Sequence, residues 1–309
     1  MNYEKLKSFL STEVFNEEID NLKNLNRGGS STNFVCKTAQ KKYLVKLLPA
    51  SNPQRAERLS NILDSLKKIP QIYTPYIVEF NQKQLFYFEK YIVIVIEFIE
   101  GKRIKHHQLN ENVLNEIFNS YQHVKDLEIS TLPQINIKET YLENIKLINN
   151  LKTKHIGYFK KKILDMMYSF NEAINTDIKL ESKPVVIHGD ASLNNIMEDK
   201  NKKIVMLDFE LMRIGYPCED WAEFLISSLA QHSIFSFPDK KFAQLVVDVN
   251  KLMNFSKMDW QYGINVYFLR LLNKRLKAKK LFKSIRKALL FILNKNKLKI
   301  ALNQIEKIY

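Results

Sequence analysis

The pattern of hydrophobic and polar residues changes character near Gly101. Before this point the apolar residues form short runs rich in β-branched and aromatic side chains, which are typical of strands. After it they recur every three or four positions over long stretches, which is typical of helices that pack on one face. We therefore expect an α+β protein with two lobes, a small antiparallel β-rich lobe over residues 1–101 and a larger, mainly helical lobe over residues 102–309.

The smaller part is expected to contain a hairpin, one helix and further strands. Two apolar runs around a polar turn predict the hairpin over residues 33–48. Pro53 begins and Pro70 ends a helix expected over residues 54–68, because proline fits the first helical turn but not the interior. Additional antiparallel strands are expected at residues 77–80, 85–88 and 92–98.

The larger part is expected to be helical with one insertion. Residues 185–208 interrupt the helical pattern, since two short apolar runs flank a polar loop there, and we interpret this segment as a second hairpin. Elsewhere the apolar spacing predicts helices over residues 113–127, 141–151 and 158–174.

Composition excludes several classes of protein. With 309 residues and 45% hydrophobic residues the chain can bury a large core, so it is not wholly disordered. Its two cysteines are too few for a disulfide scaffold or a four-thiolate zinc site. The N-terminus lacks a signal-peptide pattern and no apolar stretch is long enough to span a bilayer, so we expect a cytoplasmic protein.

The net charge of +15 is concentrated at the C-terminal end. Residues 261–309 contain thirteen Lys and Arg residues and one acidic residue, so this segment carries +12 of the total. Such a block can bind nucleic acid, anionic lipid or a phosphorylated substrate, or it can be the solvated side of ordinary helices. Residues 270–299 in particular combine helical apolar spacing with many cations, which allows weak association with an anionic membrane; no specific nucleic acid is expected.

The strongest chemical signal is a set of polar residues after two apolar runs. Asp190 follows the first run in His188-Gly189-Asp190, Asn195 lies five residues later, and Asp208 ends the second run. One carboxylate and one amide are enough for Mg²⁺, which retains waters and substrate phosphates. A further carboxylate can accept the proton of an attacking hydroxyl during phosphoryl transfer.

These residues resemble the motifs of the aminoglycoside phosphotransferase/choline kinase family, which has a protein-kinase-like fold. Asp208-Phe209-Glu210 is similar to the choline-kinase branch, and the segment from Gly215 to Ala222 looks like the family's Gly-x-Pro-x-x-Asp-hydrophobic-Ala motif. The resemblance implies Mg-ATP-dependent transfer of a phosphoryl group. It further implies that Asp190 is the catalytic base and that Asn195 and Asp208 hold magnesium.

The smaller lobe would bind the nucleotide. Lys46 in an apolar strand resembles the family's phosphate-contacting lysine, and burying its charge requires an anionic partner. Glu57 in the expected helix is the best candidate for that partner, with Asp64 as the second. Two further segments match the family by position: a phosphate-covering turn at Gly28, Gly29, Ser30 and Ser31, and an adenine-binding hinge at the backbone of Glu97 and Ile99.

The acceptor is expected to be the hydroxyl of a small metabolite, either an amino alcohol such as choline or ethanolamine, or a sugar. Only twelve positions separate Asp208 from Asp220, which is too short to seat a peptide, and the basic C-terminal end disfavours polycationic aminoglycosides. Glu210 can support the metal or contact substrate, and Trp221 and Trp260 are candidates for an aromatic cage or for plain core. A catalytically silent module that binds nucleic acid or membrane is the alternative of another class.

Overall fold

The computed structural model describes residues 2–25, 31–129, 132–153, 158–172, 174, 176–178, 180, 182–230 and 240–277. The chain forms two compact units. The first contains residues 1–102, 127–131 and 197–210, and the second contains residues 103–126, 132–196 and 211–309. Among the described residues, no helix combines the length and the hydropathy needed to cross a membrane.

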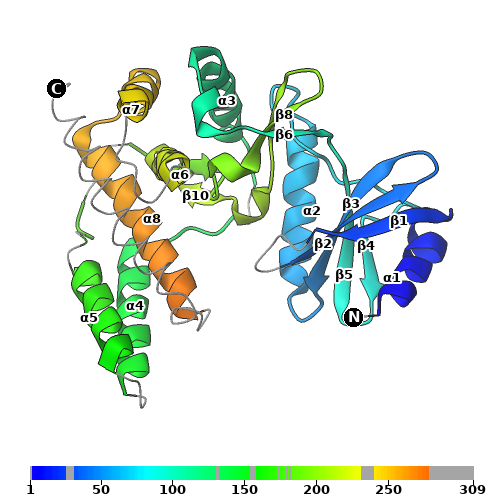
Figure 1. Ribbon diagram of the computed structural model, residues 1–309, viewed down its shortest axis with the longest axis horizontal. Coiled ribbons are helices and arrows are strands. Elements are labelled where there is room, and N and C mark those ends of the chain that lie inside the picture. The colour runs from blue at the N-terminus through cyan, green and yellow to red at the C-terminus, as the bar shows by residue number, and fades with distance from the viewer. Residues whose placement is uncertain are drawn as a thin grey trace. The chain divides into compact units, whose positions relative to one another are not determined.

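An antiparallel five-stranded sheet forms the centre of the first unit (Figure 1). Its spatial order is β1-β2-β3-β5-β4, so that β3 lies in the middle with neighbours on both sides. The strands are β1 (Ile19–Asn24), β2 (Thr32–Thr38), β3 (Lys42–Pro49), β4 (Leu85–Phe88) and β5 (Tyr91–Glu97).

The two faces of this sheet are covered by different helices (Figure 1). Val45 and Leu47 of β3 belong to a core cluster with α1 (Tyr3–Phe9) and the π-helical turn η1 (Leu10–Phe15). Side chains alternate along a strand, so Lys46 points to the opposite face, where α2 (Pro53–Lys67) packs on β3 and β5. The alternation thus places one lysine on the α2 side of an otherwise apolar strand.

Most of the elements expected in this unit are confirmed. The hairpin is β2–β3, the helix is α2, and the last two expected strands are β4 and β5. The strand expected at residues 77–80 is wrong, since Ile77 and Phe80 form only isolated bridges. The sequence pattern missed β1, because only Ile19 and Leu22 of its six residues are buried and the others are polar.

The described part of the second unit is mainly helical (Figure 1). Helix α8 packs against both α4 and α6, and the buried Asn144 of α4 donates from Nδ2 to the carbonyl oxygen of Leu269 on α8 at 3.2 Å. The three helices expected from periodicity correspond to α3, α4 and α5. The helices are α3 (Glu111–Val124), α4 (Ile137–Lys152), α5 (Tyr158–Glu172), α6 (Pro217–Ala230), α7 (Lys240–Met253) and α8 (Lys257–Lys277).

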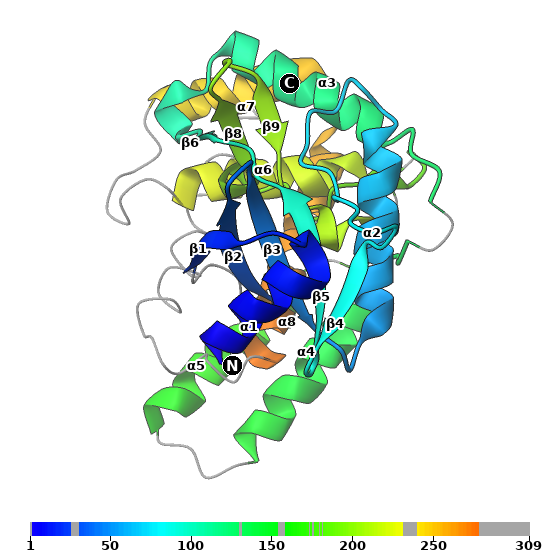
Figure 2. The same cartoon turned by 90° about the vertical axis from the view of Figure 1, so that its right-hand side faces the viewer.

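The hairpin expected over residues 185–208 is wrong in its pairing. The first run, β7 (Val185–Ile187), pairs with β10 (Arg213–Gly215). The second run, β9 (Ile204–Met206), pairs with β8 (Ile196–Asp199), which β6 (Gly101–Arg103) borders on its other side (Figure 2). The reason is that the segment expected to be a polar loop contains a short strand of its own, β8. This strand, and not β7, pairs with β9.

This pairing explains why the first unit includes residues 197–210, which lie far beyond the boundary expected near Gly101. The β8–β9 hairpin is bonded to the loop after α2. The Met206 amide donates to the carbonyl oxygen of Tyr73 at 3.0 Å, and the Tyr73 hydroxyl donates to Asp199 at 3.3 Å. Asp208 and Glu210 therefore belong to the same unit as Lys46.

Candidate active site

Lys46 is the centre of a cluster of charges in the first unit. Its Nζ atom lies 3.1 Å from Oδ1 of Asp208 and 2.5 Å from Oε2 of Glu210. Burial alone would lower the pKa of Lys46, but the two carboxylates outweigh that effect and the pKa is raised. The lysine therefore remains charged in a buried position, as a phosphate-binding cation must.

The partner of Lys46 is not the one expected from the sequence. Glu57 is exposed on α2, and Asp64 accepts hydrogen bonds from Nε2 of Gln84 instead. The prediction failed because it considered only acids on α2, the helix that follows Lys46 in sequence. The acid that pairs with Lys46 is Glu210, which lies 164 positions further along the chain. Glu210 also pairs with Arg55 of α2, a residue that the sequence analysis did not single out.

Asp208 has a conformation that few residues other than glycine adopt. Its φ is +62°, in the left-handed region, which Asp tolerates better than most residues. Its side chain is 48% exposed, although one of its oxygens contacts the buried Lys46. The turn therefore presents a carboxylate to solvent at the end of β9, which is what a metal ligand at an open site requires.

The second set of residues forms a loop after β7 in the second unit, residues 188–195, which we call the catalytic loop. Gly189 lies at φ +79°, and a Cβ atom there would lie 1.9 Å from the carbonyl oxygen of Leu211. Only glycine can occupy this position. His188 is buried, and its Nδ1 accepts the amide of Asp190 at 3.3 Å, so its ring supports the loop from inside.

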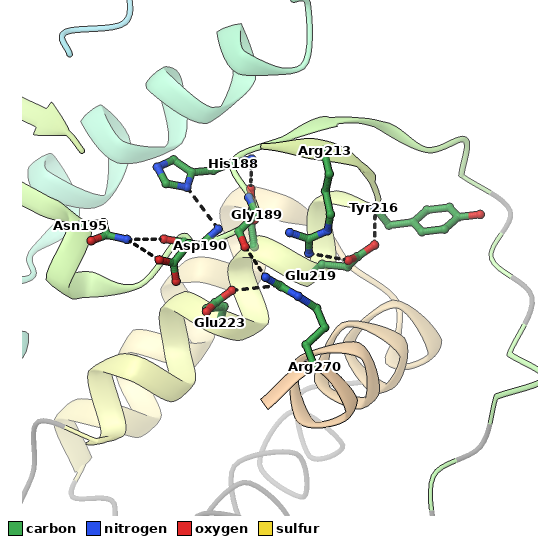
Figure 3. A network of polar contacts seen from close by, with 10 residues as sticks. His188, Gly189, Asp190, Asn195, Arg213, Tyr216, Glu219, Glu223 and Arg270 are labelled. Atoms are coloured by element: carbon green, nitrogen blue, oxygen red, sulfur yellow. Dashed lines mark hydrogen bonds and ion pairs between the residues drawn. The ribbon is translucent and has the colours of Figure 1, made fainter. Parts of the chain in front are cut away.

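Two charged side chains from different helices hold the catalytic loop (Figure 3). Asp220, in the first turn of α6, accepts the amides of His188 and Gly189 at 2.7 and 2.8 Å. Arg270 of α8 donates to the carbonyl oxygen of Gly189 at 2.5 Å. Hydrogen bonds to ionised groups are stronger than neutral ones, so the backbone beside Asp190 is firmly fixed.

Asn195 is bonded to Asp190 through its amide nitrogen (Figure 3). Nδ2 donates to the backbone oxygen of Asp190 at 2.8 Å and to its Oδ2 at 3.0 Å. Both partners are acceptors, so the nitrogen must face them, and Oδ1 is left without a partner among the described residues. An amide oxygen of this kind fits Mg²⁺, which prefers oxygen ligands.

Metal-ligating side chains are otherwise sparse in the described part of the chain, which contains no group of three or more His, Cys, Asp or Glu able to hold an ion. Magnesium does not require such a group, because it retains waters and takes phosphate oxygens as ligands. Asn195 and Asp208 therefore remain the residues that fit the metal, each within its own unit.

Glu223 of α6 is a second carboxylate near the catalytic loop. Its Oε2 lies 3.3 Å from Nη1 of Arg270. Removal from water raises the pKa of Glu223 to about 8; Arg270 lowers it in part, and the negative charge of Asp190 raises it further. Near neutral pH Glu223 is therefore largely protonated.

Arg213 is a buried cation near the catalytic loop that the sequence analysis did not single out. It is 2% exposed, and its Nη2 donates to Glu219 at 2.8 Å, while the other oxygen of Glu219 accepts the amide of Tyr216 (Figure 3). This pair braces β10, which borders the strand that leads into the catalytic loop. The sequence feature that pointed to a buried cation here was Glu219, an acidic residue within the Gly-x-Pro-x-x-Asp segment that Arg213 neutralises.

The expected nucleotide contacts are described only in part. Gly28, Gly29 and Ser30 lie outside the described residues, and Ser31, just before β2, donates from Oγ to Asn33 at 3.3 Å. At the expected hinge, the amide of Glu97 already donates to Tyr76. The backbone N–H and C=O of Ile99 form no hydrogen bond with described residues, so both groups are available to a ligand.

Both tryptophans lie in the core of the second unit and are 1% exposed. Trp221 packs against Tyr121 and Phe224, and Trp260 donates from Nε1 to Asn250 at 2.7 Å. An aromatic cage must present ring faces to a ligand, and these rings present none. Of the two roles left open for these tryptophans, the structure therefore favours plain core over an aromatic cage.

Comparison with known proteins gives the context for these residues. The model of the phosphotransferase enzyme family APH matches residues 21–242 of the chain. The chain belongs to this family. No curated protein matches it.

Solved structures of APH-type enzymes share the fold of this chain, at identities too low to indicate more than the fold. Spectinomycin phosphotransferase APH(9)-Ia is 14% identical, with a TM-score of 0.66 over 98% of this chain and 99% of that one. An aminoglycoside phosphotransferase from Alicyclobacillus acidocaldarius is 14% identical, with a TM-score of 0.63 over 94% and 92%. Choline kinase LicA from Streptococcus pneumoniae is 16% identical, with a TM-score of 0.56 over 98% of both chains.

These findings confirm the expected α+β, protein-kinase-like fold class and the resemblance to aminoglycoside and choline kinases. As a member of the APH family the chain is a phosphotransferase enzyme. The acceptor differs among the similar proteins, which include kinases of antibiotics and of choline, so family membership does not identify the acceptor of this chain.

Proposed function

We propose that this phosphotransferase uses Mg-ATP to phosphorylate a hydroxyl group of a small metabolite. The observation that carries the proposal is the pairing of Asn195 with Asp190, which orients the Asp190 carboxylate while leaving the Asn195 amide oxygen for a cation. The Lys46–Asp208 contact supplies the other half of the chemistry, a buried cation for phosphates beside an exposed carboxylate. Similar proteins bind ADP or AMP-PNP, which supports a nucleotide as the donor.

In this mechanism Asp190 orients the acceptor hydroxyl and receives its proton as the oxygen attacks the γ-phosphorus. The bond to the leaving β-phosphate oxygen breaks as the new P–O bond forms, so the products are ADP and a phosphate ester. Lys46 compensates the charge of the phosphates. Asn195 and Asp208 would hold magnesium, which when bound screens the phosphate charges and orients the transferred group.

For the acceptor we propose an amino alcohol or a sugar, without ranking one above the other. An amino alcohol would need an aromatic cage, which Trp221 and Trp260 cannot supply because both are buried in the core. Among other aromatic residues of α8, Tyr262 and Phe268 are also buried, and Tyr267 is half-buried. A sugar would instead require several polar contacts. Aminoglycosides remain the second alternative, since one of the similar proteins is an aminoglycoside phosphotransferase.

The proposal is tested by measuring ADP release with Mg-ATP over a panel of choline, ethanolamine, sugars, amino sugars, nucleosides and aminoglycosides. Acceptor-dependent ADP release for at least one class supports the proposal. A chain that releases no ADP with any acceptor, and that binds RNA or anionic vesicles in a salt-sensitive manner, would instead be a silent binding module.

A further inference from the structure

Glu210 is buried between two cations that come from different elements of the first unit. Its Oε2 atom lies 2.5 Å from Nζ of Lys46 on β3. Its Oε1 atom accepts a hydrogen bond from Nε of Arg55 on α2 and forms an ion pair with Nη2 of the same residue. The side chains of Glu210 and Lys46 are 9% and 7% exposed, so little water screens these contacts. One carboxylate thus joins the central strand to the helix.

The four charged groups of this cluster form a balanced set. Lys46 and Arg55 carry two positive charges, and Asp208 and Glu210 carry two negative charges. Removing one partner of a buried pair leaves an uncompensated charge, which is strongly unfavourable. Of the two acids Glu210 is the buried one, whereas Asp208 is half-exposed and is the candidate metal ligand.

Helix α2 contributes a cation to this cluster rather than an anion. In protein kinases a glutamate from a helix holds the strand lysine. Here Glu57 of α2 is exposed and Asp64 is bonded to Gln84, so neither acid of the helix reaches Lys46. The acid comes from two positions after Asp208, and the helix reaches that acid through Arg55.

We propose that Glu210 is the positioning residue that holds Lys46 in place for the nucleotide phosphates, and that Arg55 ties Glu210 to helix α2. The inference rests on the proposed function, because it assumes that Lys46 contacts a nucleotide. It goes beyond that function in assigning part of the affinity for Mg-ATP to the pair Arg55–Glu210, which acts through the contact of Glu210 with Lys46.

The test compares the variants Glu210→Gln and Arg55→Gln with two control variants on helix α2. Glu57→Gln removes the same kind of charge from an exposed site, and Arg58→Gln removes a cation with no ion-pair partner among the described residues. The Kd of Mg-ATP for the full chain is measured by calorimetry at a temperature where each variant is folded, together with the thermal midpoint and the KM of ATP and of the acceptor.

We expect Glu210→Gln to weaken Mg-ATP binding by about 10- to 100-fold and Arg55→Gln by about 10-fold, which corresponds to about 1.4–2.8 kcal/mol. The controls should stay within about twofold of the wild type. The double variant should lose less than the sum of the single losses, because both act through one contact. Arg55→Lys should recover only part of the affinity, since lysine lacks the guanidinium's two N–H groups on one oxygen.

The outcomes separate this inference from the proposed function. If the wild type binds Mg-ATP and Glu210→Gln binds it as tightly as Glu57→Gln does, the positioning role is wrong while the proposed function stands. A lower thermal midpoint with unchanged Kd would likewise contradict it, because that result describes a purely structural pair. If the wild type binds no Mg-ATP, both the inference and the proposed function are wrong.

Discussion

Glu223 shows how strongly one position can depend on its surroundings. Its side chain is 12% exposed, and the groups that act on it are Arg270, Asp190, Arg213 and Asp220. The Arg270 contact at 3.3 Å is a single hydrogen bond at the outer limit of distance, so it offsets only part of the cost of burial. The neutral form of Glu223 is therefore favoured in the folded chain.

This raised pKa predicts a pH-dependent stability. The pKa of Glu223 is about 8 in the folded chain and about 4.3 in an unfolded one. Between these values the folded state binds more protons, so its contribution to stability is complete below about pH 4.3 and is lost as pH rises through 8, by at most about 5 kcal/mol. We expect Glu223→Gln to be more stable than the wild type at pH 8.5 and to lose less stability between pH 5 and 8.5.

Chemical unfolding at a series of pH values measures this difference. The same variant should keep its turnover near pH 7 within about threefold, because glutamine mimics the protonated acid that is already present. Equal pH dependence for wild type and variant would show that Glu223 is ionised in the folded protein, paired with Arg270.

Individual residues were predictable where a short motif carries them. Asp190 and Asn195 were expected to act together, and the structure places them in hydrogen-bonding contact. The partner of Lys46 could not be predicted, because periodicity constrains which face of a helix is buried but not which distant acid reaches a buried cation. Glu57 was a plausible choice by proximity in sequence, and tertiary pairing with Glu210 overrode it.

At the level of elements, the start of α6 is the main support of the catalytic loop. Asp220 uses both oxygens to accept two successive backbone amides of the loop, those of His188 and Gly189. Such a contact fixes the position of Asp190 more strictly than a single bond would. Helix α8 reinforces the support through Arg270 and the carbonyl oxygen of Gly189.

We expect Asp220→Asn to lower kcat by about 10- to 100-fold, since small displacements of catalytic groups have effects of this size. The amide group would face one of the two N–H donors with its own NH₂ and leave that donor unsatisfied. The Kd of Mg-ATP should change by less than about threefold, because Lys46 and Asp208, the residues proposed to contact the phosphates and the metal, lie in the other unit and keep their contacts.

A matched control is Asp259→Asn, which alters an acid at the start of α8 whose side chain, among the described residues, bonds only Ser256. It should lower the thermal midpoint slightly, as loss of a helix cap does, and leave kcat unchanged. Equal losses of kcat in both variants would contradict a specific role of α6 in supporting the loop.

Elements with strong periodicity were predictable, and short strands were not. The helices α3, α4 and α5 follow from apolar spacing over fourteen to sixteen residues, whereas α2 follows from Pro53 and Pro70, which bound it. The three-residue strands β7 and β9 were recognised as strands, yet their pairing was not, because runs this short carry no information about register. The strand β8, which begins at residue 196, pairs with β9, and β7 pairs with β10 instead.

At the scale of the whole molecule the dominant property is charge. The chain carries +15, and +12 of it lies in residues 261–309. The structure describes this segment only to Lys277, so the amphipathic spacing expected at residues 270–299 lies largely outside the described residues. A weak association of this region with anionic membranes therefore remains a proposal.

The net charge predicts how the reaction responds to salt. Mg-ATP is an anion, and a strongly positive protein attracts it over a distance set by the Debye length, about 30 Å at 0.01 M and about 8 Å at 0.15 M ionic strength. We expect kcat/KM for ATP to fall several-fold across this range. An acceptor that is a polycation should show the opposite trend, because salt screens its repulsion. A kcat/KM for ATP that rises with salt would contradict steering by the net charge.

Asp190 is proposed to be the base of the phosphoryl transfer, a role distinct from binding the nucleotide. The most direct test measures turnover and Mg-ATP affinity together for Asp190→Asn, which keeps the size of the side chain and an acceptor for Asn195. We predict that turnover falls by about 100- to 10,000-fold, the usual contribution of a general base, while the Kd of Mg-ATP stays within about threefold of the wild type. Turnover within about twofold of the wild type would contradict the mechanism.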